Sequence, residues 1–308
     1  MSGLAPGLWT VLATPFTGAD HALDTASLTR ETQTFATAGA VGLVALGVFG
    51  EAAALDAEER ERVLRTVVAA VPELPVVVGL PARATAPAIE QAQAAVRGCR
   101  TDAGDRLAGV MVQVHSGDAA VVTDHLHAVH EATGAPVVLQ DYPALTGVRI
   151  GADALVTVVE RCPFVVAVKA EAPPTPNAIA ALAPRVSVPM FGGLGGVALI
   201  DELAAGAAGA MTGFSHPEAL AAVLAAWDTG GFAAAHAAWS PWLPLATFEQ
   251  QAGIALGLRK QLLARRGIID APGVRPPAPA APERLLPLLD QHLAHVRQLA
   301  TDHRSAGV

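Results

Sequence analysis

The chain has 308 residues, of which 52% are hydrophobic, enough apolar material for a large core, so the composition excludes global disorder. The formal net charge of −8, with no block of Lys and Arg to offset it, argues against a nucleic-acid partner. No apolar run approaches the roughly 20 residues of a membrane span, and the two cysteines, Cys99 and Cys162, fit a reduced cytoplasmic protein better than a disulfide framework.

From the amino end, short apolar strands alternate with amphipathic helices. Eight strands are predicted, at 8–13, 41–46, 75–79, 109–113, 136–140, 164–169, 186–191 and 208–213. Eight helices are predicted after them, at 25–39, 56–71, 85–97, 118–133, 151–161, 176–184, 196–205 and 217–228. Apolar strands joined through helices indicate a parallel sheet covered on its outer face. Eight such units predict a closed (β/α)8 barrel; a doubly wound sheet is the weaker alternative, because the first strand-to-helix turn lacks G-x-G-x-x-G.

The strand signals stop after about residue 230. Residues 231–267 have a helical pattern, residues 272–282 form a proline-rich link, and a last helix is predicted at 283–299. This tail is too short for an independent domain. We therefore expect residues 1–230 to form the barrel and residues 231–308 to form a C-terminal helical extension that packs on it.

The sixth predicted strand ends at Lys169, which with Lys260 makes up all the lysine in the chain. Arginine cannot lose its proton near neutral pH, whereas a buried lysine can, and it can then form a Schiff base with a carbonyl. Barrel enzymes place their sites at the carboxyl ends of the strands. Lys169 is therefore the candidate catalytic nucleophile; the alternative is an ordinary strand-end lysine that reaches solvent.

The strand before it leads to the only tyrosine of the chain, Tyr142. Strand side chains alternate with period two, so Gln140 and Tyr142 would share a face, as would Lys169 and Glu171. A lysine, a phenol and a carboxylate that meet at the carboxyl ends of the barrel strands are suited to imine formation followed by proton transfer. Tyr142 is thus a candidate catalytic residue, and Gln140, Asp141 and Glu171 are candidate substrate contacts. The alternatives are a packing role for Tyr142 and a salt-bridged rim position for Glu171.

Two glycine-rich turns at the carboxyl ends of strands complete the candidate site. The first follows the second strand and could bind a carboxylate through its backbone amides; it consists of Gly47, Val48, Phe49, Gly50 and Glu51. The second, Gly192–Gly196, follows the seventh strand, where barrels often bind phosphate, and makes Gly192 and Gly193 candidate substrate contacts. Glycine-rich turns in barrels also occur with no ligand, so both interpretations stay open.

The histidines do not favour a metal site. His125, His127 and His130 share one predicted helix, but the first two point about 200° apart. His292 and His295 lie on a late helix, and neither group brings in carboxylates or cysteines at ligand spacing. Histidines on solvated faces are the better explanation, and neither a metal nor another cofactor is expected.

Four short segments are weak signals singly, but together, in this order and spacing, they indicate a family. They are A-T-P-F at 13–16, G-V-F-G-E at 47–51 with Leu55 and E-E-R at 58–60, the Tyr142-Pro143 turn with Thr146-Gly147, and V-K at 168–169. In these segments the chain resembles the dihydrodipicolinate synthase / N-acetylneuraminate lyase family of class I aldolases, over nearly its whole length. The resemblance implies a (β/α)8 TIM barrel with a C-terminal helical extension. It also implies a homo-oligomer, commonly a homotetramer, with Lys169 as the Schiff-base lysine for a 2-oxo acid.

The chain also departs from the pattern of the family it resembles. The usual G-T-T-G-E is G-V-F-G-E at 47–51, so both threonine hydroxyls that help to hold the keto-acid carboxylate are missing. The family's catalytic tyrosine stands where this chain has Gln140, and Tyr142 could replace it only from a shifted position. The arginine two residues after the proline is Leu145, and the aromatic pair after the fourth strand is replaced by residues 115–116. True dihydrodipicolinate synthase activity is therefore not expected.

The sequence predicts a class I lyase of the aldolase type that acts on a small carbonyl compound, with no nucleic-acid or membrane partner. One alternative is a sugar-acid dehydratase or hydratase that uses the same imine. The other is a catalytically inactive barrel that binds a metabolite.

Overall fold

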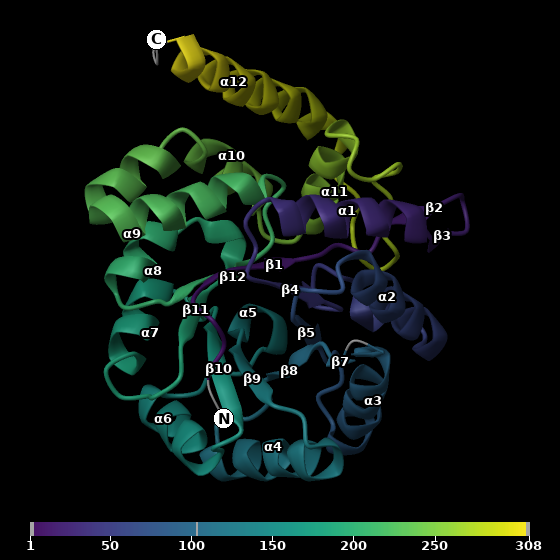
Figure 1. Cartoon of the computed structure of the whole chain (residues 1–308), viewed down its shortest axis with the longest axis vertical. Helices are drawn as coiled ribbons and strands as arrows, with labels where there is room; N and C mark the ends of the chain where they lie inside the picture. The colour runs from purple at the N-terminus through teal and green to yellow at the C-terminus, as the bar shows by residue number, and fades with distance from the viewer. Residues whose placement is uncertain (1–2, 103, 306–308) are drawn as a thin grey trace.

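Eight parallel strands close into a barrel in the computed structural model, which describes residues 3–102 and 104–305 (Figure 1). In order around the barrel they are β1 (Gly7–Val11), β12 (Gly209–Thr212), β11 (Met190–Gly192), β10 (Val165–Ala170), β9 (Val137–Asp141), β8 (Leu107–Gln113), β5 (Val76–Gly79) and β4 (Gly42–Ala45). The predicted (β/α)8 barrel is confirmed. The seventh strand begins at Met190 rather than at residue 186, because Pro189 just before it has no N–H to give to the ladder.

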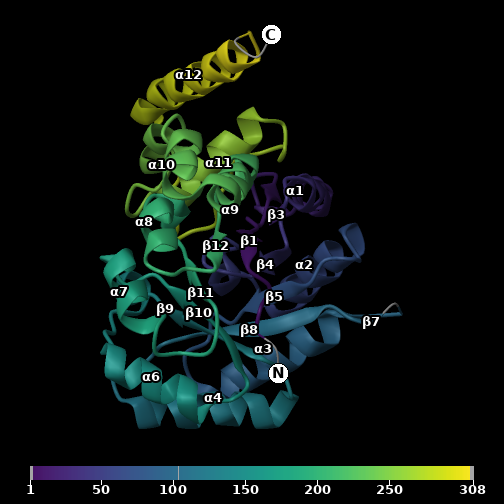
Figure 2. The same cartoon turned by 60° about the vertical axis from the view of Figure 1, so that its left-hand side comes forward.

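Helices surround the barrel (Figures 1 and 2). They are α1 (Thr25–Thr37), α2 (Ala57–Ala70), α3 (Thr85–Gly98), α4 (Ala119–Thr133), α6 (Ala152–Arg161), α7 (Thr175–Leu182), α8 (Leu199–Ala204) and α9 (Pro217–Trp239). Each agrees with its predicted helix to within a few residues, except that α9 runs well past residue 228. The structure adds elements that were not predicted: a short helix, α5 (Pro143–Thr146), and two hairpins, β2–β3 (Phe16–Thr17, Ala22–Leu23) and β6–β7 (Arg100–Thr101, Gly104–Asp105).

The strand side chains alternate between the inside of the barrel and the layer under the helices. Val138 of β9 and Ala167 of β10 belong to the inner apolar cluster, whereas Leu139 belongs to the outer one. Side chains two residues apart share a face. Gln140 therefore lies inside the barrel, while Asp141 faces the outer layer.

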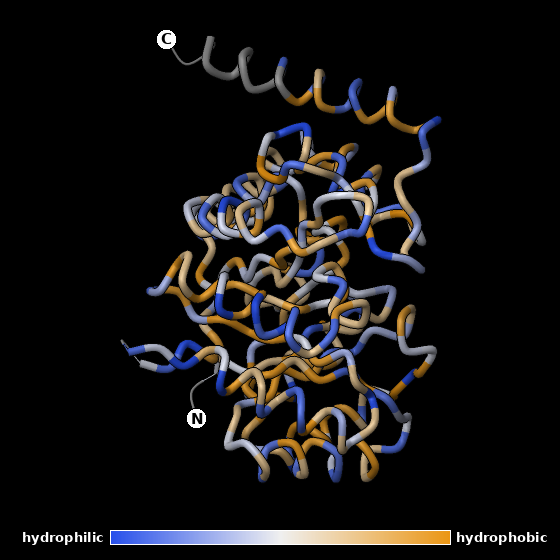
Figure 3. The backbone as a smooth tube through the Cα atoms, turned by 90° about the vertical axis from the view of Figure 1, so that its right-hand side faces the viewer, coloured by the Kyte–Doolittle hydropathy of each residue, from blue (hydrophilic) through white to orange (hydrophobic). Residues whose placement is uncertain are grey.

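The chain beyond the barrel is helical. It comprises α10 (Leu243–Glu249), α11 (Ala255–Arg265), a turn of 3₁₀ helix at Glu283–Leu285, and α12 (Leu286–Ser305). Leu289, Leu293 and Val296 form the buried face of α12, and they share an apolar cluster with residues of α10. The alternation of polar and apolar colour along α12 follows from this spacing (Figure 3). The division of the chain at residue 230 stays a prediction; α9 is interrupted there, at Gly231, where φ is 61°. Within the described residues, none of the helices combines the length and apolar character required to cross a membrane.

Candidate active site

Lys169 lies inside the barrel at the carboxyl end of β10. Its side chain is 7% exposed, so it does not reach for solvent, and its Nζ lies 3.2 Å from Oε2 of Glu171. Glu171 is itself buried rather than a residue of the rim. The two opposite charges are thus held next to each other, away from bulk water.

Glu171 is fixed by two further donors. Nε2 of Gln140 donates to Oε2 of Glu171 at 2.6 Å, and the backbone N–H of Leu194 donates to Oε1 at 3.3 Å. Gln140 is the parallel-ladder partner of Lys169, so the two side chains start side by side on adjacent strands. Strand pairing and these hydrogen bonds together set the position of the carboxylate against the amine.

Tyr142 lies just beyond the end of β9 and opens α5. It lines a small cavity of about 20 Å³ together with Gln140, Lys169 and Glu171. Lysine, phenol and carboxylate therefore meet in one place, although Tyr142 no longer has strand geometry. Burial raises the pKa of Tyr142, and the charge of Glu171 raises it further. The phenol is consequently protonated at neutral pH and can act as a proton donor.

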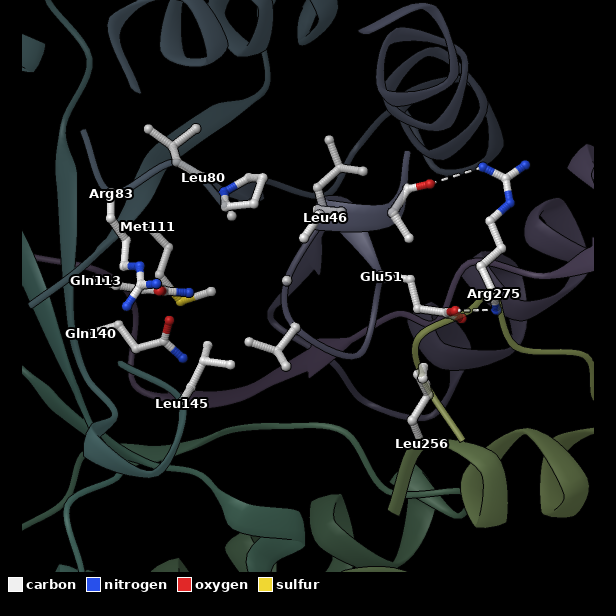
Figure 4. Close-up of a pocket in the computed structure, with 18 of the residues that line it drawn as sticks. Leu46, Glu51, Leu80, Arg83, Met111, Gln113, Gln140, Leu145, Leu256 and Arg275 are labelled. Atoms are coloured by element: carbon white, nitrogen blue, oxygen red, sulfur yellow. Dashed lines mark hydrogen bonds between the residues drawn. The ribbon is translucent and has the colours of Figure 1, made fainter. Parts of the chain in front are cut away.

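A larger cavity of about 670 Å³ adjoins this one and shares Val48 and Gln140 with it. Its volume falls in the range of roughly 300–1,000 Å³ that is usual for small-molecule sites. Figure 4 shows Arg83, Gln113 and Gln140 gathered on one side of it, with the amide oxygen of Gln140 turned toward the other two side chains. Apolar side chains line much of the rest, including those of Leu46, Leu80, Met111 and Leu145. A substrate larger than the small cavity could extend into this space.

The turn at residues 47–51 borders both cavities. The residues at its two edges, Leu46 and Glu51, have positive φ values of 57° and 50°, a conformation that costs free energy in non-glycine residues. Within the turn, the amide of Gly50 donates to the carbonyl of Gly47 and that of Glu51 to Val48. These two amides are therefore not available to an anion.

The carboxylate of Glu51, predicted to contact substrate, belongs to a residue that lines the larger cavity and is already held by the protein. It accepts hydrogen bonds from Nζ of Lys260 and from the backbone N–H of Arg275, the latter at 2.8 Å. Lys260 is completely buried on α11, and Nζ also donates to the carbonyl of Gly273 at 2.8 Å. Burial lowers the pKa of Lys260. No role was predicted for Lys260, although the rarity of lysine in this chain was the available signal.

The phosphate interpretation of the turn at Gly192–Gly196 stays a prediction, and the contacts of this turn do not favour it. A Cβ at Gly193 would collide with the carboxylate of Glu171, and one at Gly192 would collide with that of Glu202. Two amides of the turn are also occupied, since Leu194 donates to Glu171 and Gly195 donates to Thr212. These glycines make room for two protein carboxylates, and neither Gly192 nor Gly193 lines the two cavities described above.

The substrate contact predicted for Asp141 also stays a prediction that the geometry does not favour. Asp141 faces the outer layer, lines neither of these cavities, and its Oδ1 has no hydrogen-bond partner among the described residues. Burial raises the pKa of Asp141 to about 6, with a further contribution from the charge of Glu171. The same alternation of side chains that brings Gln140 into the barrel turns Asp141 away.

One of the predicted surface histidines is buried. His125 is 3% exposed, its Nδ1 lies 2.9 Å from Oγ1 of Thr85, and its ring centroid lies 4.4 Å from that of His115. The expected solvated face is therefore wrong for His125, because α4 packs this side chain against the neighbouring helix. In the part of the chain that the structure describes, no three His, Cys, Asp or Glu side chains are arranged to hold a metal ion.

A closed eight-stranded barrel with a buried Lys–Glu pair at the carboxyl ends of its strands defines a barrel enzyme. A model of the dihydrodipicolinate synthetase family matches residues 5–295, and the chain belongs to this family. One relative is an L-2-keto-3-deoxyarabonate dehydratase of Azospirillum brasilense, which is 29% identical over 89% of this chain and 88% of that protein. Another is a 4-hydroxy-tetrahydrodipicolinate synthase of Kineococcus radiotolerans, which is 31% identical over 90% of this chain and 89% of that protein.

The crystal structure of a dihydrodipicolinate synthase from Rhodopseudomonas palustris has the same fold. Its TM-score is 0.87 and its sequence identity 28%, over 96% of this chain and all of that one. The chain is therefore an enzyme of a lyase and aldolase family, which sets aside the alternative of an inactive barrel.

Proposed function

We propose that the enzyme is a Schiff-base-forming lyase in which Lys169 condenses with a 2-oxo acid longer than three carbons. The observation that carries the proposal is the buried pair of Lys169 and Glu171, 3.2 Å apart. An ammonium group must lose a proton before it can attack a carbonyl, and Glu171 is an acceptor within reach. The adjoining cavity of about 670 Å³ has room for the rest of a longer acid.

In this scheme the amine of Lys169 adds to C2 of the acid, and water leaves to give an iminium ion. The iminium withdraws electrons from C3. When a hydroxyl on C4 loses its proton, the C3–C4 bond breaks, an aldehyde departs, and the electrons remain as an enamine. C3 then takes up a proton, and water hydrolyses the imine to release the shorter 2-oxo acid and free Lys169. Glu171 and Tyr142 are the groups that carry these protons.

Dehydration is the second candidate, and it uses the same iminium. Loss of a C3 proton would give the enamine, which expels the C4 hydroxyl as water without breaking a carbon–carbon bond. The similarity to the dehydratase of Azospirillum brasilense, over 89% of the chain, favours this route.

Borohydride reduction in the presence of candidate acids tests the proposal. Pyruvate, 2-oxoglutarate and L-2-keto-3-deoxyarabonate are each incubated with the enzyme and borohydride, and the peptide that contains Lys169 is then weighed by mass spectrometry. We expect an adduct with at least one of the two acids longer than pyruvate. We expect none with Lys169→Arg, which keeps the positive charge beside Glu171 but cannot form the imine. No adduct with either of the two longer acids would overturn the proposal.

Product analysis on the trapped acid separates the two candidates. Two carbon fragments indicate an aldolase, and a single product that has lost one water indicates a dehydratase. Assembly as a homo-oligomer, a tetramer or dimer, and a cytoplasmic location stay predictions; light scattering at assay concentration tests the first.

A further inference from the structure

Arg259 on α11 is fully buried and only partly satisfied. Its Nε donates to Oε1 of Glu249, whose carboxylate also accepts the backbone N–H of Ser215 at 3.1 Å. Nη1 and Nη2 have no hydrogen-bond partner among the described residues. A buried guanidinium has five N–H donors, and leaving several of them unpaired costs free energy. The position therefore calls for an acceptor that the chain itself does not supply.

The unpaired end of Arg259 lies directly behind the wall of the Lys169 cavity. The guanidinium carbon is 3.7 Å from the centre of the Phe49 ring, and a Cβ at Gly213 would collide with Nη1. Phe49 and Gly213 both line the small cavity that contains Lys169. Burial and Glu171 raise the pKa of Tyr142, while the charge of Arg259 lowers it. Arg259 therefore acts electrostatically on a residue that lines this cavity.

The residues that line this cavity include no cation other than Lys169 to meet the carboxylate of an oxo acid. Val48 and Phe49 offer no hydroxyl, and the amides of Gly50 and Glu51 are used within their own turn. The charge of Lys169 is already matched by Glu171. A substrate carboxylate would thus enter a buried site as one uncompensated negative charge, which is unfavourable unless a charged donor meets it.

We propose that Arg259 binds the carboxylate of the 2-oxo acid that forms the imine on Lys169. The inference rests on the proposed function and adds to it the residue that selects acids over neutral ketones. The carboxylate meets Nη1 beside Gly213, where no side chain intervenes, and Phe49, which is only half-buried, can turn away from the guanidinium to widen the contact. With the carboxylate held there, the carbonyl carbon is presented to Nζ of Lys169.

The test compares an acid with a neutral ketone of similar size in two variants. Arg259→Met combined with Glu249→Gln removes the guanidinium without leaving a buried carboxylate unpaired, and the glutamine oxygen can still accept the N–H of Ser215. Gly213→Ala keeps Arg259 but places a methyl group between Nη1 and the cavity. The three oxo acids named above and hydroxyacetone are titrated in the borohydride assay, and circular dichroism melting checks that each variant is folded.

For the acid that the wild type traps best, we expect the half-saturating concentration to rise roughly 10- to 100-fold in both variants, as for the loss of a charged hydrogen bond. Hydroxyacetone should be trapped equally by all three proteins. An unchanged half-saturating concentration for the acid, or an equal loss for acid and ketone, overturns the role of Arg259. Should the double variant fail to fold, Gly213→Ala alone decides the question. If the wild type traps no acid at all, the proposed function falls, and this inference falls with it.

Discussion

Nε2 of Gln140 donates a 2.6 Å hydrogen bond to Oε2 of Glu171, the same oxygen that lies 3.2 Å from Nζ of Lys169. A side-chain amide does not exchange protons with a substrate at neutral pH, so Gln140 can orient the carboxylate but cannot replace it as acid or base. In this arrangement, proton transfer at the imine is left to Glu171 and Tyr142.

Replacing Glu171 by Gln should slow imine formation by about 10²- to 10⁴-fold, the usual contribution of a general base. The amide keeps the shape of the side chain but cannot accept the proton of Lys169. Single-turnover borohydride trapping at saturating acid measures the rate. A rate equal to that of the wild type would show that the amine loses its proton to another group.

Tyr142→Phe removes one hydroxyl from the wall of the cavity. Because burial and Glu171 raise the pKa of this phenol, it is a proton donor throughout the neutral range. We expect kcat to fall about tenfold or more while KM changes little, since the aromatic ring still fills the same space. Steady-state kinetics with the substrate identified above provide the measurement; an unchanged kcat would leave Glu171 as the only proton carrier.

Lys260→Met should destabilise the protein by roughly 3–5 kcal/mol, because Glu51 would lose its buried counter-charge. The free energy of unfolding in urea measures the effect. Adding Glu51→Gln removes the unpaired buried charge, so the double variant should recover most of the lost free energy of unfolding. A single variant within about 0.5 kcal/mol of the wild type, the scatter of ordinary surface changes, would mean that this pair has little influence on the fold.

Glu31 makes the stability depend on pH. It is fully buried, one oxygen accepts the backbone N–H of Ala13 at 2.8 Å, and burial raises its pKa from 4.5 to about 8. The protonated form therefore contributes its stability in full below about pH 4.5, and this contribution is lost as the pH rises through about 8. Between these limits, Glu31 should lower the free energy of unfolding by up to about 1.4 kcal/mol per pH unit.

Glu31→Gln is the matched variant, because its amide oxygen can still accept the N–H of Ala13 but does not titrate. We expect a flatter pH dependence and a protein more stable than the wild type at pH 8. Urea unfolding at pH 5, 6.5 and 8 gives the slopes. Parallel slopes for the two proteins would mean that Glu31 titrates alike in the folded and unfolded states.

The barrel could be predicted because its signals are local. Each strand is a short apolar run and each helix has its own period, so no long-range information is needed to count eight units. The location of Lys169 follows from the same reasoning, since a residue at the end of a buried strand faces the mouth of a barrel. The outward position of Asp141 could also have been predicted, because period-two alternation places its side chain on the other face of the sheet from that of Gln140.

The remaining parts of the site depend on contacts between distant segments. A glycine pair in a turn makes space, but only the positions of Glu171 and Glu202 decide that protein carboxylates fill it. Lys260 and Glu51 are separated by 209 residues, and nothing in the pattern of either segment indicates the other. In the sequence, Arg259 is one of several charged residues on a predicted helix, and only the packing shows that its guanidinium lies over the ring of Phe49.

The attachment of Glu51 to Lys260 and to Arg275, 209 and 224 positions further along, has a consequence for biosynthesis. On the ribosome, the turn at residues 47–51 stays without these two anchors until Arg275 has emerged. The turn that borders the Lys169 cavity can therefore reach its final position only after the segment that contains Arg275 has been synthesised.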